Sequence, residues 1–347
     1  MRILYTSILA LVVVIVGYVL WWQHVSDTMI TLATNWEKQR TAEGYEISHT
    51  PFVTGGFPYR VKLNADNLFI SNPTHYQQPK IFISRFGAVI QPWQLTHVIF
   101  DVEGETIASW RNQEEERNVK ITTSSALASG TFNTQGRLET MAMDLKDVHA
   151  VPSWRPPLSA DRLQLHSRPE PKADPTGVID ATTENRQQIA LRGDNITIEG
   201  LDDFPLGTNL SEVALATVVH GTIEKLPTRE TIAKWSDNGG FLQIQALKVR
   251  WGGSALDGEG KLALDPEFRL LGNLDSRISG YDNILKALTA SGKIKPDAAR
   301  TIGFGLNLLA KEADDGTRYL TVPLSAEEGG LYLGPMFLMR LSPLFKD

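Results

Sequence analysis

Cysteine is absent from this chain of 347 residues. The sequence therefore has no disulfide framework, no thiol nucleophile and no thiolate that would ligate a metal. The absence does not fix the compartment, but it suits an oxidising one, where a stray thiol is a liability.

Positive charge is not in excess either. The chain has 34 lysines and arginines against 40 aspartates and glutamates, which gives a formal net charge of -6. No stretch combines basic residues with interleaved aromatics, so the sequence gives no reason to expect a nucleic-acid partner. Hydrophobic residues make up 42% of the chain, which is ample for a core.

Motifs for catalysis and cofactor binding are sparse. Ser254 lies near glycines but lacks the G-x-S-x-G spacing of a nucleophile elbow. Gly258 and Gly260 begin a G-x-G pattern, but a strand pattern follows them where a dinucleotide loop needs a helix. No two of the seven histidines have the i, i+4 spacing that places two ligands on one helix face. We therefore predict no cofactor, no metal site and no enzymatic activity.

What the sequence does contain is one long apolar run. Residues 3–22 carry no charge, and a helix of this length spans about 30 Å, the thickness of the hydrocarbon core of a bilayer. Trp21 and Trp22 end the run where an interfacial aromatic belt is expected. The alternative is a cleaved signal peptide, but the small residues of a cleavage site are missing there. We predict that residues 1–22 are a retained transmembrane anchor and that a membrane is a partner of this protein.

The orientation of the anchor rests on a slight charge asymmetry. Arg2 and the α-amino group precede the span, whereas residues of both charges follow it. The positive-inside rule then favours a cytoplasmic N-terminus, which places residues 23–347 outside the cytoplasm. In a Gram-negative bacterium the anchor would lie in the inner membrane and the bulk of the chain in the periplasm.

Residues 23–44 have a helical pattern. Met29, Leu32 and Trp36 recur at helical spacing, and Gly44 is a plausible stop. Two arrangements fit this pattern: a stalk helix that lifts the following domain off the bilayer, or a helix that packs on that domain.

Strands dominate the rest of the chain. Apolar and polar residues alternate from residue 57 to residue 66, which predicts a strand whose buried face holds Tyr59, Val61 and Leu63. The alternation changes phase near Asn67, where we expect a bulge or bend. Similar alternating runs occur at residues 98–102, 163–165, 262–264, 320–324 and 331–333.

The stretch at residues 213–219 is apolar on both faces of a strand. Val213, Leu215 and Val219 share one face, while alanines and another valine share the other. Such a strand is central in its sheet or lines a dry cavity. A curled sheet with an apolar concave face makes a groove, so these three residues are the candidates for lipid contact. The alternative is that they belong to an ordinary core.

Helices are predicted only late in this domain, at residues 229–237, 281–289 and 296–313. Proline-rich stretches at 151–158 and 168–177 predict loops, because proline interrupts both helices and strand ladders. The predicted fold is therefore mainly β (α+β): an anchor, then a curled, largely antiparallel sheet domain over residues 45–347. A subdivision near 168–177 is the alternative.

Several short motifs occur in an order that resembles a known family. They include Gly55-Gly56-Phe57-Pro58-Tyr59-Arg60, Trp154-Arg155-Pro156-Pro157, Trp251-Gly252, Gly258-Glu259-Gly260-Lys261-Leu262-Ala263-Leu264-Asp265 and Leu331-Tyr332-Leu333-Gly334-Pro335. Together they resemble the bacterial envelope family catalogued as domain of unknown function 2125, over almost the whole chain. The resemblance assigns family positions to Gly56, Phe57, Pro58, Arg60, Trp154, Trp251, Gly252, Gly260, Asp265, Gly334 and Pro335. It implies an envelope protein, and it brings no established activity.

The glycine and leucine rhythm of these motifs is also similar to that of the broader AsmA-like proteins of Gram-negative envelopes. That likeness implies a membrane-tethered, β-rich protein linked to lipid transport and outer-membrane assembly. This chain is much shorter than the bridge-like members, so it is not expected to span the periplasm alone.

Three functions fit these observations. The first is a non-enzymatic envelope protein that binds or transfers lipid or aids envelope assembly, which requires an apolar groove. The second is a tethered scaffold that recruits envelope proteins through an exposed sheet edge. The third is a tethered hydrolase, which requires a histidine and an acid in a polar cleft. We favour the first, because the chain combines an anchor with alternating strands and lacks a catalytic motif.

Overall fold

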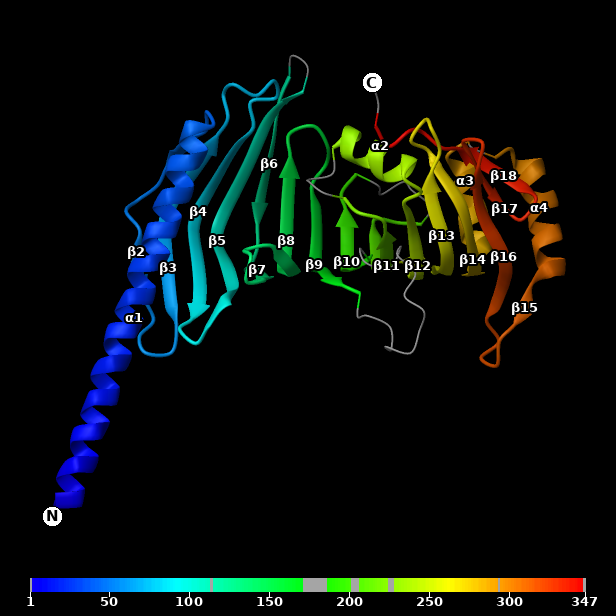
Figure 1. The fold of residues 1–347 in the computed structure, drawn as a ribbon. Coiled ribbons are helices and arrows are strands. Elements are labelled where there is room, and N and C mark those ends of the chain that lie inside the picture. The colour runs from blue at the N-terminus through cyan, green and yellow to red at the C-terminus, as the bar shows by residue number, and fades with distance from the viewer. Residues whose placement is uncertain are drawn as a thin grey trace. The chain divides into compact units, whose positions relative to one another are not determined.

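The computed structural model describes residues 2–112, 115–170, 186–200, 206–223, 228–292 and 294–345. The protein is mostly antiparallel sheet, with 53% of its residues in strands and 23% in helices. A long apolar helix precedes the strands, and three shorter helices lie in the C-terminal part (Figure 1). The predicted mainly β fold class is confirmed.

The chain divides into two compact units, Met1–Pro157 and Leu158–Asp347, called unit 1 and unit 2 below. The junction falls inside the proline-rich stretch at 151–158. Strands run into this stretch and into the start of the next one, since Pro152 ends one strand and Pro169 ends another. The loops predicted at 151–158 and 168–177 therefore begin later than expected. Residues 171–177, with the subdivision expected near 168–177, lie outside the described residues.

Unit 1 is one long helix on an antiparallel sheet. Its elements are α1 (Arg2–Ala42), β1 (Glu46–Ser48), β2 (Val53–Gly55), β3 (Val61–Ser71), β4 (Lys80–Gln91), β5 (Gln94–Asn112), β6 (Glu115–Thr122), β7 (Ser125–Phe132) and β8 (Leu138–Pro152). Both short strands β1 and β2 pair with β3, and β3 continues to β4 and β5. The long β5 pairs with both β6 and β7, and each of these pairs with β8.

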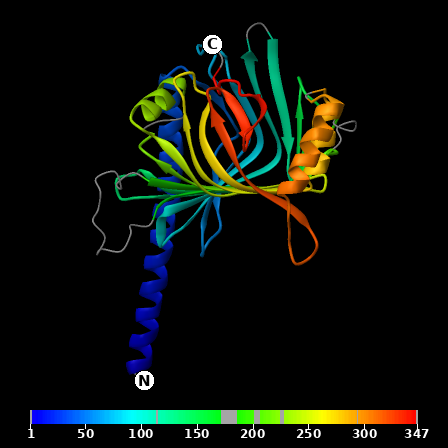
Figure 2. The same cartoon turned by 90° about the vertical axis from the view of Figure 1, so that its right-hand side faces the viewer.

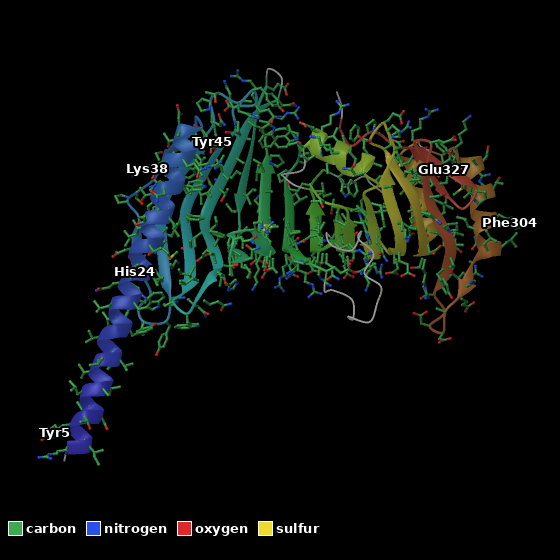
Figure 3. The ribbon with its side chains drawn as sticks, viewed as in Figure 1. Tyr5, His24, Lys38, Tyr45, Phe304 and Glu327 are labelled. Atoms are coloured by element: carbon green, nitrogen blue, oxygen red, sulfur yellow. The ribbon has the colours of Figure 1, made fainter. Side chains whose placement is uncertain are left out.

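The second half of α1 packs on this sheet. Val25 forms a buried cluster with Val61 of β3 and Ile90 of β4, and Ser26 donates a hydrogen bond of 2.8 Å to Thr54. The first half projects beyond the strands (Figures 1 and 2), and no residue of its most apolar window is buried. Tyr5 lies on the projecting part, and His24 lies where the helix first meets the strands (Figure 3). Of the two arrangements considered for residues 23–44, a stalk or a helix packed on the domain, the residues around Val25 adopt the packed one.

The buried face of β3 begins later than the sequence pattern predicted. Val61 is 0% and Leu63 is 4% exposed, as expected, whereas Tyr59 is 74% exposed and precedes the strand in a turn. The prediction for Tyr59 was wrong because the turn before β3 breaks the alternation. The irregularity expected near Asn67 is present, since this residue has a φ of 53°.

Unit 2 is an antiparallel sheet with three helices. Its elements are β9 (Leu158–Pro169), β10 (Arg186–Ile198), β11 (Asn209–His220), α2 (Arg229–Asp237), β12 (Phe241–Trp251), β13 (Ser254–Leu264), β14 (Leu270–Ser279), α3 (Tyr281–Ala290), α4 (Pro296–Leu309), β15 (Lys311–Glu312), β16 (Arg318–Glu327), β17 (Gly330–Leu333) and β18 (Met336–Arg340). Strands β9 to β14 pair in chain order, followed by β16, β17 and β18, and β15 also pairs with β16. The predicted central strand at 213–219 is β11, which has neighbours on both edges.

The three predicted helices of unit 2 are present. Thr228 caps α2 through a reciprocal capping box with Thr231. Helix α4 begins at Pro296 as predicted, but it ends at Leu309 because the next residues pair with β16 as β15. Side chains of α3 and α4 close a buried cluster around Ile278, Tyr281 and Leu320. These helices therefore cover one face of the sheet at β14 and β16.

Candidate functional site

A row of leucines crosses four neighbouring strands of unit 2. Leu165 of β9 lies directly opposite Leu191 of β10, which lies opposite Leu215 of β11, which lies opposite Leu247 of β12. Residues directly opposite each other in antiparallel strands share one face of the sheet. These four residues, called the leucine row below, therefore form one apolar stripe across β9–β12.

A parallel row connects this stripe to the core of unit 2. Its members, in strand order, are Leu163, Gly193, Val213, Val249, Leu256, Ile278 and Leu320. Ile278 and Leu320 belong to the cluster that α3 and α4 cover. The leucine row thus lies on the same face as those helices, and Leu215 is three strands away from Ile278.

The other face of the same strands is polar. Arg192, Ala214, Lys248, Asp257 and Arg277 lie opposite one another from β10 to β14. Arg192 forms ion pairs of 3.0 Å with Asp194 and 3.1 Å with Glu212. On this face β11 carries alanines at positions 214 and 216. The strand itself is apolar on both sides, but the face of the sheet that holds these alanines is polar on the neighbouring strands.

The three lipid-contact candidates differ in exposure. Val213 and Leu215 are partly buried, and Leu191 beside Leu215 is 44% exposed. Val219 is 7% exposed and lies at the end of β11, next to His220, whose carbonyl accepts a 2.8 Å hydrogen bond from Trp235 of α2. Val219 is therefore enclosed near α2, while Val213 and Leu215 lie on the more open part of the apolar face.

A constellation suited to hydrolysis is not assembled among the described residues. His49 lies 3.5 Å from the carboxylate of Glu37, and its ring packs in a tilted geometry against Phe52, with ring centroids 4.1 Å apart. His220 bonds Gln243 at 3.1 Å and stacks on Phe241, so its side chain is satisfied at a strand end. Across the described ranges no three His, Cys, Asp or Glu residues are placed to hold a metal ion.

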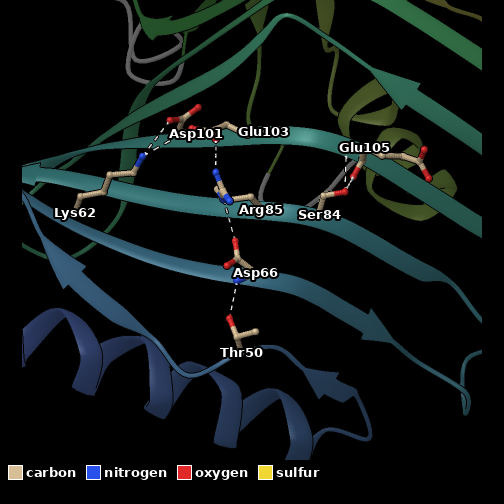
Figure 4. Close-up of polar contacts among 8 residues, drawn as sticks. All are labelled: Thr50, Lys62, Asp66, Ser84, Arg85, Asp101, Glu103 and Glu105. Atoms are coloured by element: carbon tan, nitrogen blue, oxygen red, sulfur yellow. Dashed lines mark hydrogen bonds and ion pairs between the residues drawn. The ribbon is translucent and has the colours of Figure 1, made fainter.

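A polar cluster lies across β3, β4 and β5 of unit 1 (Figure 4). Arg85 donates hydrogen bonds of 2.9 Å to Asp66 and 3.1 Å to Glu103, while Lys62 lies 3.5 Å from Asp101. The hydrogen bond to Asp66 and then that to Glu103 raise the pKa of Arg85 above its usual value. Charges of both signs are paired here at the surface, so the cluster is a cross-strand ion network with no free group for catalysis. The sequence reasoning missed it, because strand pairing alone brings these residues together.

Unit 1 also contains an apolar hollow of about 480 Å³ at the ends of β3, β4 and β5. Ile70, Ile81 and Ala108 lie opposite one another in its lining. Trp110, also in the lining, packs edge-on against Trp154 with ring centroids 5.1 Å apart. The volume is in the range of small-molecule pockets, and Trp154 supports its wall.

The model of one protein family matches residues 22–341, and its description is an uncharacterized protein conserved in bacteria (DUF2125). The chain belongs to this family. No curated protein and no solved structure matches the chain. The match confirms the family resemblance seen in the motifs, and the wider likeness of this DUF2125 protein to AsmA-like proteins stays a prediction.

The first DUF2125 motif forms the turn before β3. Gly56 has a φ of 97°, and a side chain there would meet the Arg60 carbonyl at 2.8 Å, so the turn requires glycine. The turn is closed by a 3.1 Å hydrogen bond from the Arg60 N–H to the Gly56 carbonyl. Within it, the Pro58 carbonyl accepts a hydrogen bond from Tyr18 of α1, and the Arg60 carbonyl accepts one of 2.9 Å from Trp22. Phe57 packs edge-on against Trp22.

The motif glycines of unit 2 permit close backbone approach. Gly252 has a φ of 54°, and a side chain there would lie 2.7 Å from Leu206 Cα, while the neighbouring Trp251 donates a 2.9 Å hydrogen bond to Gly207. Gly260 lies inside β13, where a side chain would meet Leu274 Cα at 2.9 Å and the Asn273 carbonyl. Gly260 therefore allows the backbones of β13 and β14 to approach each other closely.

Asp265 organises the turn between β13 and β14. Its carboxylate accepts hydrogen bonds of 3.0 Å from the Glu267 N–H, 2.8 Å from the Arg269 N–H and 2.6 Å from the Arg269 guanidinium. Burial acts to raise the pKa of Asp265, but the hydrogen bonds and charge of Arg269 outweigh it and hold this pKa below its usual value. Asp265 is thus a turn residue with its acceptors in use.

The last motif is also structural. Gly334 and Pro335 form the turn between β17 and β18, and the Gly334 N–H donates a 2.7 Å hydrogen bond to the Pro323 carbonyl. The DUF2125 positions therefore lie at separate turns and close strand contacts. The structure brings none of them to the leucine row.

Proposed function

We propose that this DUF2125 protein is a non-enzymatic protein of the bacterial inner membrane that binds or transfers lipid from the periplasmic side, or aids envelope assembly in this way. Its lipid-contacting surface is the apolar face of unit 2 around Val213 and Leu215, with Val219 at its enclosed end. The leucine row carries this proposal.

The physical argument starts from the exposure of the row. Leu191 is 44% exposed and its neighbours are only partly buried, so apolar surface on four adjacent strands stays in contact with water. Covering such surface is favourable by about 25 cal/mol per Å². An acyl chain is long, flexible and apolar, and it fits a stripe that crosses several strands better than a compact polar ligand does.

The proposed location follows from α1 and from the family. Helix α1 is long and apolar enough to cross a membrane, and its apolar window is near the N-terminus. The family is conserved in bacteria, and Arg2 before the span favours a cytoplasmic N-terminus. A protein tethered in this way has a source of lipid within reach.

Lipid binding is tested with the full chain held in a detergent-free polymer. A fluorescent fatty acid and a fluorescent phospholipid are titrated, and native mass spectrometry with lipid extraction identifies bound species. Leu191→Glu and Leu215→Glu are expected to weaken uptake about 10-fold or more, since each places a charge in the apolar stripe. Ala214→Glu is the matched control, because it lies on the polar face between Arg192 and Lys248.

The proposal is rejected if the protein shows neither saturable uptake nor extracted lipid. A cooperative thermal unfolding transition must first show that the protein is folded. The second candidate function would then be preferred, a tethered scaffold that recruits an envelope protein. It is favoured by β18, whose described partner is β17 and which exposes 52% of Phe337 and 47% of Met339. Such an edge accepts an added strand.

A further inference from the structure

Two turns of unit 1 hold α1 at the end of its apolar run. One is the turn before β3, where Tyr18 and Trp22 donate to the carbonyls of Pro58 and Arg60. The other is the turn between β4 and β5, where the indole N–H of Trp21 donates a 3.0 Å hydrogen bond to the Pro92 carbonyl. These three contacts, made from Tyr18, Trp21 and Trp22 within about one and a half helical turns, fix the depth of α1 relative to the two turns.

The same turns, together with the adjoining parts of α1 and β5, expose large apolar side chains. Trp21 is 43%, Phe57 53%, Tyr59 74%, Trp93 61% and Leu95 47% exposed. We call these five residues the collar. Single exposed apolar residues need no explanation, but a contiguous group of aromatics indicates an interaction surface.

The position of the collar indicates its partner. It lies beside the end of the apolar run of α1, and the preceding part of α1 is the segment long and apolar enough to cross a membrane. Tryptophan and tyrosine are enriched at the membrane–water interface, where an apolar ring and a polar group are both satisfied. The exposed side chain of Arg60 lies in the same turn, within reach of lipid phosphates.

We infer that the collar lies in the headgroup region of the bilayer that α1 crosses and docks unit 1 directly on the membrane surface. The inference rests on the anchoring of α1 proposed above. Its partner is a phospholipid bilayer, and its mode is interfacial burial of aromatic side chains from three segments of the chain. This inference gives the first DUF2125 motif a role. Its glycine-dependent turn accepts the hydrogen bond from Trp22 and places Phe57 and Tyr59 in contact with lipid.

The rigidity of α1 makes the docking specific. The helix continues without a break from Arg2 to Ala42, and Val25 and Ser26 are buried in unit 1. Unit 1 therefore does not hang on a flexible linker, and the collar is held at one depth. A helix that leaves the bilayer at Trp22 brings the collar to the interface without any conformational change.

The absence of cysteine allows a direct test with the full chain. Single cysteines are introduced at Tyr59 and Trp93, labelled with a nitrobenzoxadiazole fluorophore, and the protein is reconstituted into phosphatidylcholine–phosphatidylglycerol vesicles. Tyr76→Cys is the matched control, because Tyr76 is 81% exposed and follows the far end of β3, about 30 Å from the collar. Val13→Cys reports the depth of α1 itself.

Nitroxide lipids are expected to quench the labels at positions 59 and 93 several-fold more strongly than the label at 76, with emission shifted to the blue. The inference is overturned if the labels at positions 59 and 93 are as exposed to water as the label at position 76 while the label at position 13 lies in the hydrocarbon. The anchor would remain supported in that case. An aqueous label at 13 would reject the anchor and the inference together. Circular dichroism melting of each variant confirms that the label reports on folded protein.

Discussion

The indole N–H of Trp22 donates a hydrogen bond of 2.9 Å to the backbone carbonyl of Arg60, 38 positions further along the chain. This contact joins the end of the apolar run to the glycine-dependent turn of the first family motif. It makes the N-terminal segment part of the folded structure of unit 1, and it bears directly on whether that segment is retained.

We expect the mature protein to keep residues 3–22. Removal after Trp22 would leave the carbonyls of Pro58, Arg60 and Pro92 without the donors that they have in the structure. N-terminal sequencing of protein extracted from membranes is the measurement. A mature terminus after Trp22 would contradict both retention and the anchor.

A charge at the centre of the apolar run is expected to impair membrane insertion. Val13 lies near the middle of residues 3–22 and is 62% exposed, so an arginine there would face lipid. Val13→Arg should cost about 3 kcal/mol of insertion free energy. The fraction resistant to alkaline carbonate extraction measures this. Gln23→Arg, just beyond the run, is the control and should insert as the wild type does.

Val61→Asp is expected to destabilise unit 1 strongly. Val61 is 0% exposed and packs against Val25 and Ile90, so the new carboxylate would be buried without a partner. A loss of more than about 3 kcal/mol in the free energy of unfolding is expected. Lys62→Asn on the opposite face should cost less than about 1 kcal/mol, because it removes only partly exposed ion pairs with Asp101 and Glu103. Equal effects in denaturant unfolding would disprove the assigned face.

Two nearby glycines of β13 are expected to respond differently to alanine. Gly260→Ala would place a methyl group against the backbone of Asn273 and Leu274, and we expect a loss of about 2 kcal/mol or more. Gly258→Ala meets no atom closer than 3.7 Å and should change stability by less than about 1 kcal/mol. Thermal unfolding of both variants decides; a tolerant Gly260 would remove the close-approach explanation of this family position.

The contribution of Asp265 to stability is expected to depend on pH. The pKa of this carboxyl is lowered in the folded protein, so its stabilising effect is fully present above the unfolded value of 3.8 and is lost as pH falls through the folded pKa. The difference in unfolding free energy between the wild type and Asp265→Asn should therefore be largest near neutral pH and shrink below 3.8. A difference that stays constant down to the acid limit would show that Arg269 does not act through the carboxylate charge.

Much of this fold could be predicted because local patterns decided it. The apolar run from residue 3 to residue 22, the capping of α2 by Thr228 and Pro296 at the start of α4 each depend on residues close in sequence. Alternation predicted the strands for the same reason, and it failed at Tyr59, where a turn interrupts it. The family motifs were also recognisable, since their order along the chain needs no structure.

An apolar helix, a β-rich chain and membership of the family can all be inferred from the order of the residues alone. The leucine row is visible only in the folded protein, because strand register places Leu165, Leu191, Leu215 and Leu247 from four separate segments opposite one another. Only the tertiary structure joined Trp21 to Pro92 and Trp22 to Arg60, because these hydrogen bonds connect positions 71 and 38 residues apart. Periodicity reports which face of a strand is apolar, whereas pairing across the sheet decides what that face meets.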